Sequence, residues 1–346
     1  MTKKASFIFP SLKRGGGNRM LLSIMNKFIS EGYECEIFYL KNKGNSFLLP
    51  KKINETYIFS KRKSLLIKII QIFWLCFLAR RSNANYFFFS DPIIGIFSFL
   101  FKKKKIRYVQ GNDEELFDKN KLASSLIIKT YKFFFRLSKR IEVDKLIFNS
   151  KYSLESYFEV NMGSNHPIVN PYVFNSSKND IKKEPTNSII SVLSSHPRKG
   201  LEKFNRIINS GLFDDYDFSV ISQENLNLNS SIKFEMPKDD NAYLEALSEN
   251  SFFLSLSSFE GFGLTPLEAM SVGLIVFYYP NEGLKNYCNE SNSICNEFND
   301  LNLFKKQLDS FFADNKKFEL YSRNAIKTSE RFSEEIFQNK IFSIVK

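Results

Sequence analysis

Short hydrophobic runs alternate with stretches of helical periodicity along this chain. In the first half, runs typical of buried strands lie at 7–10, 34–40, 86–89, 106–109 and 145–149. The second half repeats the alternation, with strands expected at 188–193, 217–221, 252–256 and 274–277, and helices near 201–209, 241–248 and 266–272. Helical patterns at 301–314, 315–331 and 334–344 end the chain. Alternating strands and helices predict an α/β protein with parallel sheets.

The 346 residues leave room for two domains of ordinary size. Two successive α/β series predict two Rossmann-like domains facing one another across a cleft. Asn, Ser, Pro and Lys accumulate between the two series, so we place one domain at 1–168 and the second at 169–330. The remaining helix, 331–346, is expected to pack back on the first domain.

The segment 257–277 points most directly to a function. An apolar run leads into the loop Glu260-Gly261-Phe262-Gly263-Leu264-Thr265, and a helix with Pro266 at its first position is expected to follow. Such a loop directs backbone N–H groups and the positive end of a helix dipole at one point, which suits a phosphate or diphosphate. Glu260 and Glu268 flank that point, where their carboxylates can accept hydrogen bonds from hydroxyls.

Structural roles for both carboxylates stay open at this stage. Thr265 and Glu268 have the spacing of a capping box, in which Glu268 only accepts a hydrogen bond from the backbone at the start of the helix. Glu260 could equally be a solvated loop residue.

Residues 260–273, E-G-F-G-L-T-P-L-E-A-M-S-V-G, resemble the signature of nucleotide-sugar glycosyltransferases with the GT-B fold, glycosyltransferase family four in particular. The resemblance implies that Glu268 binds the ribose of a nucleoside-diphosphate sugar and that Glu260 binds its sugar. The loop Gly261, Phe262, Gly263, Leu264 and Thr265 would then hold the diphosphate.

Residues 192–200, V-L-S-S-H-P-R-K-G, are similar to the family segment whose lysine binds the donor diphosphate. The resemblance assigns that contact to Lys199, which could also be an ordinary loop lysine. The family commonly has an arginine five residues earlier, where this chain has Ser194. We therefore expect Arg198 or His196 to supply the missing contact.

Gly16 and Gly17, followed by Arg19, look like the family's loop that lies against the donor phosphates and the acceptor. Many relatives place a histidine after the strand expected at 106–109, where this chain has Gln110. The first 165 residues contain no histidine, so no imidazole of this half can act as a general base. A retaining mechanism tolerates this, because the leaving diphosphate can take the acceptor's proton.

Just beyond Gln110, Asp113 and Glu114 are possible acceptor ligands or plain surface acids.

The net charge of +12 belongs wholly to the first half. Residues 1–165 contain 30 Lys and Arg against 13 Asp and Glu, whereas residues 166–346 contain 19 against 24. Such a half is drawn to an anionic partner. The apolar segment 65–79, with basic flanks at 61–63 and 80–81, is either a buried helix or an interfacial helix on anionic lipid. Lys102–Lys105 beside Phe99 form a second possible membrane contact.

Four scattered cysteines without a C-x-x-C pair, and only two histidines, make a disulfide framework or a zinc site improbable. The chain also lacks a D-x-D motif, so we expect no metal and no cofactor beyond the donor substrate. The first apolar run is too short for a signal peptide, which favours the cytoplasm.

The sequence therefore predicts a retaining, metal-independent glycosyltransferase of bacterial cell-surface polysaccharide synthesis, such as lipopolysaccharide or capsule. Its expected partners are a nucleotide-sugar donor, a saccharide or lipid-linked saccharide acceptor, and the inner face of the membrane, with no nucleic acid. The alternatives are a sugar-nucleotide epimerase of the same fold and a non-enzymatic, basic nucleic-acid-binding protein.

Overall fold

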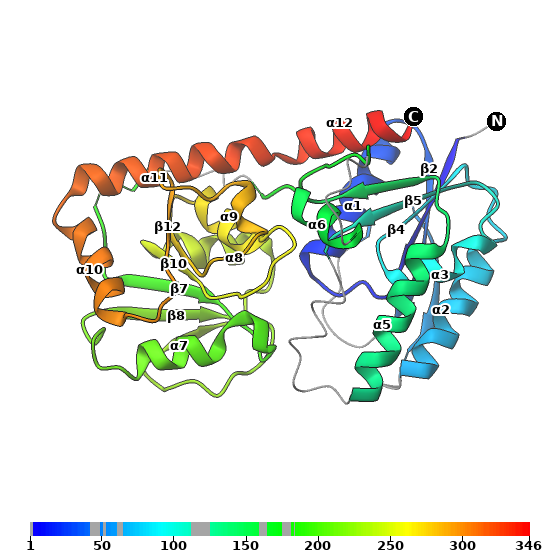
Figure 1. Ribbon diagram of the computed structural model, residues 1–346. Helices are drawn as coiled ribbons and strands as arrows, with labels where there is room; N and C mark the ends of the chain where they lie inside the picture. The colour runs from blue at the N-terminus through cyan, green and yellow to red at the C-terminus, as the bar shows by residue number, and fades with distance from the viewer. Residues whose placement is uncertain are drawn as a thin grey trace. The chain divides into compact units, whose positions relative to one another are not determined.

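The structure is a computed structural model. It describes residues 3–41, 49–50, 53–60, 65–111, 125–158, 165–174, 181–182 and 184–346. The chain forms two compact units, each built on a parallel sheet (Figure 1). The first unit contains the described residues up to Pro171 and again Glu334–Lys346, and the second contains those from Tyr172 to Ser333. Both divisions fall three residues later than predicted, at 171/172 and 333/334 instead of 168/169 and 330/331.

The first unit has a six-stranded sheet of order β3-β2-β1-β4-β5-β6. Its strands are β1 (Lys4–Phe9), β2 (Glu34–Lys41), β3 (Asn54–Phe59), β4 (Tyr86–Phe89), β5 (Lys104–Val109) and β6 (Lys145–Phe148). Its helices are α1 (Gly16–Ser30), α2 (Leu65–Ala79), α3 (Pro92–Phe97), η1 (Ser98–Leu100), α5 (Ser125–Arg140), α6 (Lys151–Phe158) and α12 (Glu334–Val345).

The last helix of the chain packs within the first unit. Ser23 of α1 donates a hydrogen bond from Oγ to Oε1 of Glu334 at 2.6 Å. The rings of Phe28 and Phe342 meet edge to face with centroids 5.1 Å apart. The chain therefore returns to its first unit at its end, by burying apolar residues of α12 against α1.

The second unit has the sheet order β12-β11-β10-β7-β8-β9. Its strands are β7 (Ser188–Val192), β8 (Asp217–Ile221), β9 (Lys233–Glu235), β10 (Phe252–Ser255), β11 (Ile275–Tyr278) and β12 (Ser293–Cys295). Its helices are η2 (Pro197–Lys199), α7 (Leu201–Ile208), α8 (Asp240–Ser248), α9 (Leu264–Ser271), η3 (Leu284–Asn286), α10 (Leu301–Phe312), α11 (Asn315–Ser329) and η4 (Glu330–Phe332).

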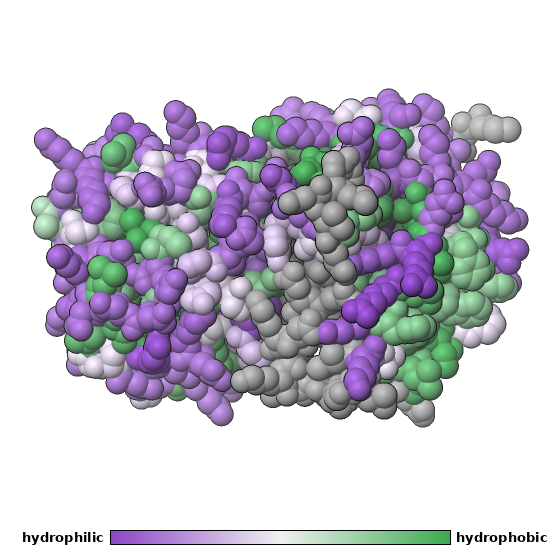
Figure 2. Space-filling view, viewed as in Figure 1, coloured by the Kyte–Doolittle hydropathy of each residue, from purple (hydrophilic) through white to green (hydrophobic). Residues whose placement is uncertain are grey.

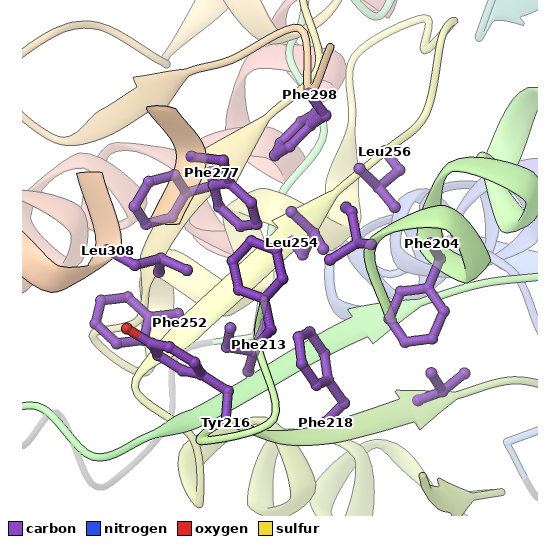
Figure 3. Packing of buried hydrophobic residues seen from close by; sticks show 14 of the residues in the cluster. Phe204, Phe213, Tyr216, Phe218, Phe252, Leu254, Leu256, Phe277, Phe298 and Leu308 are labelled. Carbon is purple, nitrogen blue, oxygen red and sulfur yellow. The ribbon is translucent and has the colours of Figure 1, made fainter. Parts of the chain in front are cut away.

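Aromatic residues dominate the core of the second unit on one face of its sheet. Phe252 of β10 and Phe277 of β11 pack against helices α10 and α11, and Phe218 of β8 packs against Phe204 of α7 (Figure 3). All four residues of β10 are buried, which is characteristic of a central parallel strand covered on both faces. This packing fixes the ends of β7 and β10, from which the candidate site is built.

Candidate active site

Each sheet reverses its strand order at one point, and the candidate residues cluster at one of these points. In the second unit, β7 and β10 are paired neighbours, whereas the strands that follow them run to opposite sides of the sheet. In open α/β sheets, ligands bind beyond the carboxyl ends of two such strands, because their outgoing loops diverge there. The loops in question are 193–199 after β7 and 256–263 after β10.

The loop after β7 is shaped by the 3₁₀ turn η2. His196 caps this turn, since its Nδ1 accepts a hydrogen bond from the N–H of Arg198 at 3.3 Å. Burial and the charges of Arg198 and Lys199 lower the pKa of His196, which keeps the ring neutral and able to accept. The predicted contact of His196 with a donor is thus accompanied by a local structural role that the sequence did not suggest.

Gly200 brings the same loop against the end of β10. Its φ of 75° lies in the left-handed region, and a Cβ at this position would lie 2.5 Å from the backbone oxygen of Leu256. The N–H of Ser258 donates to the oxygen of Arg198 at 2.9 Å, which joins the two loops directly. The approach of Arg198 and Lys199 to the second loop thus depends on glycine.

Three predicted residues, Arg198, Lys199 and Glu260, form one charged cluster. Nζ of Lys199 lies 2.7 Å and Nη1 of Arg198 lies 3.3 Å from the same atom, Oε1 of Glu260. Nη1 of Arg198 also donates to the backbone oxygen of Phe259 at 3.1 Å. The side chains of Arg198, Lys199 and Glu260 are 22%, 17% and 13% exposed, so all three groups are partly withdrawn from water.

Two opposing effects set the ionisation of Glu260. Burial raises the pKa of its carboxyl, but the charges of Lys199 and Arg198 and hydrogen bonds from Lys199 and Ser257 outweigh this and lower it to about 2. Glu260 is therefore an anion at neutral pH, and the interpretation as a solvated loop residue does not fit its surroundings.

Helix α9 begins earlier than predicted. It starts at Leu264 rather than at Pro266, because Gly263 turns the chain in the left-handed region at φ 86°. Pro266 lies within the first turn, where its missing N–H removes no helical hydrogen bond. A Cβ at Gly263 would lie 2.2 Å from Cδ2 of Leu284, so glycine is needed at this turn.

The capping box considered for Thr265 and Glu268 is not formed. The N-cap residue is Gly263, and no side chain caps the helix. The first N–H groups of any helix lack intrahelical acceptors, so those of Leu264 and Thr265 lie at the positive end of α9. The side chain of Phe262 is buried in the core, which leaves only its backbone for an anion.

Glu268 accepts a hydrogen bond from a tyrosine. It is 5% exposed, and its Oε2 accepts a hydrogen bond from the hydroxyl of Tyr243, on α8, at 3.0 Å. The hydrogen bond and the burial together fix the position of this carboxylate beside α8.

Several positioning residues were missed by the sequence analysis. Asn281 donates to the oxygen of Ser257 at 3.1 Å and thereby fixes the loop that leads to Glu260. A Cβ at Gly283 would lie 2.1 Å from the backbone oxygen of Glu260. The chain after β11 therefore packs closely against the loop that contains Glu260. The hydroxyl of Tyr287 donates to the oxygen of Gly263. The turn-like run Pro280-Asn281-Glu282-Gly283 after a strand was the available signal.

In the first unit, Gly16 is the first residue of α1 and Gly17 contacts Gln110. Nε2 of Gln110 donates to the oxygen of Gly17 at 3.0 Å, and Asn149 donates to the oxygen of Gln110 at 2.8 Å. These residues follow β1, β5 and β6, so the structure brings the glycine loop and Gln110 together at the carboxyl ends of the strands. Asp113 and Glu114 lie outside the described residues.

The comparisons with known proteins concern the fold and the kind of enzyme. Residues 214–328 match the model of the family Glycosyl transferases group 1, a segment that contains Glu260 and Glu268 but not Arg198 and Lys199. Solved structures of glycosyltransferases share the fold of nearly the whole chain. The chain is a glycosyltransferase with the GT-B fold.

Three of these structures are similar to the chain along its length despite low sequence identity. Sucrose-phosphate synthase from Thermosynechococcus elongatus has a TM-score of 0.78 at 13% identity, covering 99% of this chain and 98% of its own. WaaG, a glycosyltransferase involved in lipopolysaccharide biosynthesis, has a TM-score of 0.74 at 14% identity, covering 99% of each chain. HepE from Anabaena, solved with UDP and glucose, has a TM-score of 0.73 at 14% identity, covering 99% of each chain. No protein with a curated description matches the chain by sequence.

No three His, Cys, Asp or Glu side chains among the described residues are grouped so as to hold a metal ion. Within the same residues, every helix is too short or too polar to cross a membrane.

Proposed function

We propose that this glycosyltransferase is a retaining, metal-independent enzyme that moves a sugar from a nucleoside-diphosphate sugar to a saccharide or lipid-linked saccharide of the bacterial cell surface. The main support for this proposal is the charged cluster of Lys199, Arg198 and Glu260, which lies in the loops before α9. HepE, which is similar in fold, was solved with UDP and glucose, and WaaG takes part in lipopolysaccharide biosynthesis.

In this proposal the donor diphosphate binds between the two cations and the N-terminus of α9. Negative charge gathers on the leaving oxygen as the bond to the anomeric carbon loosens, and fixed positive charge at that place lowers the barrier. Lys199 and Arg198 already share Oε1 of Glu260, so the diphosphate would share or replace that carboxylate as their counterion. Glu268, oriented by Tyr243, would accept hydrogen bonds from the ribose hydroxyls.

The reaction proposed for this site proceeds on one face of the donor sugar. The bond from the anomeric carbon to the diphosphate oxygen breaks, and the acceptor oxygen bonds to that carbon on the same face. The acceptor's proton passes to the departing diphosphate, so the first unit needs no general base. Glu260, ionised at neutral pH, would bind sugar hydroxyls and stabilise the positive charge that develops on the ring.

We propose further that the enzyme acts in the cytoplasm, bound peripherally to the inner face of the membrane through α2. One face of α2 is buried in the core through Ile69, Ile72, Leu75, Cys76 and Ala79. The opposite face exposes Leu66, Ile70 and Trp74 by 67%, 49% and 52%, at the spacing of successive helical turns. Hydrophobic residues gather over α2 in Figure 2. In this proposal the buried interpretation applies to one face of the helix and the interfacial interpretation to the other.

Basic and aromatic residues near α2 fit an anionic lipid surface. Arg80 and Arg81 follow the helix and are exposed. Phe99 is 61% exposed, and Lys102 and Lys103 close by in sequence are exposed as well. Residues 61–63, the other predicted basic flank, lie outside the described residues.

A panel of UDP-, GDP- and dTDP-sugars, read by thermal shift and by product analysis, tests the proposal. Stabilisation by one donor, with transfer to an added saccharide acceptor and retention at the anomeric carbon, is the expected result. An inverted product, or activity abolished by EDTA and restored by a divalent metal, would contradict the mechanism. Conversion of the donor sugar without an acceptor would support the epimerase instead.

A further inference from the structure

A second charged site lies in the first unit, away from the glycine loop. It is a pocket of about 490 Å³ where β6 begins, formed by the end of α5, the turn 141–144, Tyr157 of α6 and residues 165–167. Gln110 and Asn149 follow the opposite, carboxyl ends of β5 and β6. The pocket is therefore on the other edge of the sheet from the loop that contains Gly17.

Arg107, in the wall of this pocket, is a buried charge that contacts the described residues through hydroxyl groups. The residue is 2% exposed. Its Nη1 donates to Oγ of Ser138 and to the hydroxyl of Tyr157, both at 3.2 Å, and its guanidinium lies 5.6 Å from the centre of the Tyr157 ring. Among the described residues, no atom accepts a hydrogen bond from the buried Nε, and no carboxylate forms an ion pair with Arg107. A buried charge left in this state costs stability, so its surroundings suit an anion.

The rest of the lining adds positive charge and an apolar wall. Lys139 is on α5, and its Nζ lies 5.1 Å from the centre of the same Tyr157 ring. Lys139, Arg140 and Lys145 join Arg107 in the lining, against two carboxylates, Glu142 and Asp144. Asp144 already accepts a hydrogen bond from the backbone of Lys105 at 2.8 Å. The apolar lining residues are Ile141, Val143, Leu146 and Pro167.

We propose that this pocket binds a phosphate monoester, with the phosphate near Arg107 and Lys139 and any organic part against the apolar wall. Four cations against two carboxylates leave a charge that matches a dianion. A guanidinium next to a lysine is a combination suited to phosphate, because the fork of arginine fits two oxygens and lysine adds a point charge. The proposal is independent of the donor site.

Calorimetric titration of the full chain with inorganic phosphate, against chloride at constant ionic strength, tests the proposal. The Lys199→Ala variant serves as the background, so that the proposed donor site does not contribute. Arg107→Gln is expected to weaken binding roughly 10-fold to 100-fold, as for loss of a charged hydrogen-bond donor. Lys139→Gln, on a half-buried residue, gives a second variant if the first fails to fold, and should weaken binding several-fold.

Lys151→Gln is the matched control, because it removes an exposed charge of the same unit outside both the pocket and the proposed membrane contact. Its affinity for phosphate should equal that of the background. Vesicles of phosphatidylcholine with and without phosphatidic acid distinguish the source of the phosphate. Binding that depends on Arg107 only with phosphatidic acid would assign a lipid headgroup, and such binding with inorganic phosphate would assign a soluble ligand. Binding in neither case, or equal weakening by Lys151→Gln, would overturn the proposal.

Discussion

Lys199 donates a hydrogen bond from Nζ to Oε1 of Glu260 at 2.7 Å, although 61 residues separate the two in sequence. The contact joins the loops that follow two neighbouring strands, β7 and β10. It places a cation and an anion together where the strand order reverses. The two charges therefore balance each other, and in the proposed reaction both residues would contact the bound donor.

Removal of the cation should abolish most donor binding. We expect Lys199→Ala to weaken UDP binding roughly 10-fold to 100-fold, since a hydrogen bond to a charged group contributes about 1.5–3 kcal/mol. The binding of UDP is measured by calorimetry. Lys285→Ala removes an exposed lysine of the same unit that also pairs with a glutamate, and should leave the affinity unchanged. If Lys199→Ala bound UDP as tightly as the wild type, the assignment of Lys199 to the donor site would be wrong.

The two carboxylates should affect different kinetic constants. Contacts to the ribose are alike in ground and transition states, so Glu268→Gln is expected to weaken donor binding more than it lowers kcat. Glu260→Gln should mainly lower kcat, because contacts to the sugar strengthen as the bond breaks. Tyr243→Phe, which removes only the hydroxyl on Glu268, should share the Glu268 effect to a smaller extent. A Glu268→Gln enzyme that loses thermal stability alone would contradict the ribose assignment.

Stability should depend on pH through Glu260. Its pKa is lowered from 4.5 to about 2, so its stabilisation is complete above pH 4.5 and is lost as the pH falls toward 2. The shift corresponds to a loss on the order of 3 kcal/mol over that window. Urea unfolding at several pH values should show Glu260→Gln less stable than the wild type at neutral pH, with the difference shrinking in acid. A difference that stays constant would show that the ion pairs do not stabilise the fold.

Gly200 should be intolerant of a side chain. Gly200→Ala combines a left-handed backbone with a Cβ that would lie 2.5 Å from the oxygen of Leu256. We expect a loss of about 2–4 kcal/mol in the free energy of unfolding, from backbone strain and the clash together. Gly211→Ala is the control, because Gly211 has a φ of 70° but no atom lies within 4 Å of an added Cβ. This variant should lose only the free energy of unfolding that backbone strain accounts for. Similar losses in both variants would mean that the contact with Leu256 is unimportant.

Membrane attachment should depend on both salt and the exposed face of α2. The wild type is expected to float with anionic liposomes at low salt and to dissociate at high salt, since each basic residue near the surface contributes about 1 kcal/mol. Ile70→Ser combined with Trp74→Ser should reduce flotation strongly. Leu303→Ser combined with Leu320→Ser is the matched control, because these residues are similarly exposed on the second unit. Equal binding to neutral and anionic liposomes would contradict the proposal.

The strands of the sheet interiors were predictable from the sequence, whereas three edge strands were not. β4 was predicted with its observed bounds, and β10 to within one residue, because buried central strands are largely continuous apolar runs. β3, β9 and β12 lie at sheet edges and are short or partly exposed. Their own residues specify little, because the unpaired hydrogen-bonding groups of the neighbouring strand determine where they form.

The sequence by itself determined the fold class and the residue types of the proposed donor site, because hydrophobic periodicity and the 260–273 signature are local patterns. Only the tertiary structure decided what those residues contact. Because Gly263 turns the chain, α9 begins at Leu264 and the capping box does not form. The close approach of Gly200 to Leu256 brings Lys199 within hydrogen-bond distance of Glu260. Which face of α2 is buried was likewise decided by the sheet beneath it. Such outcomes depend on contacts between residues far apart in sequence, and a local pattern does not contain them.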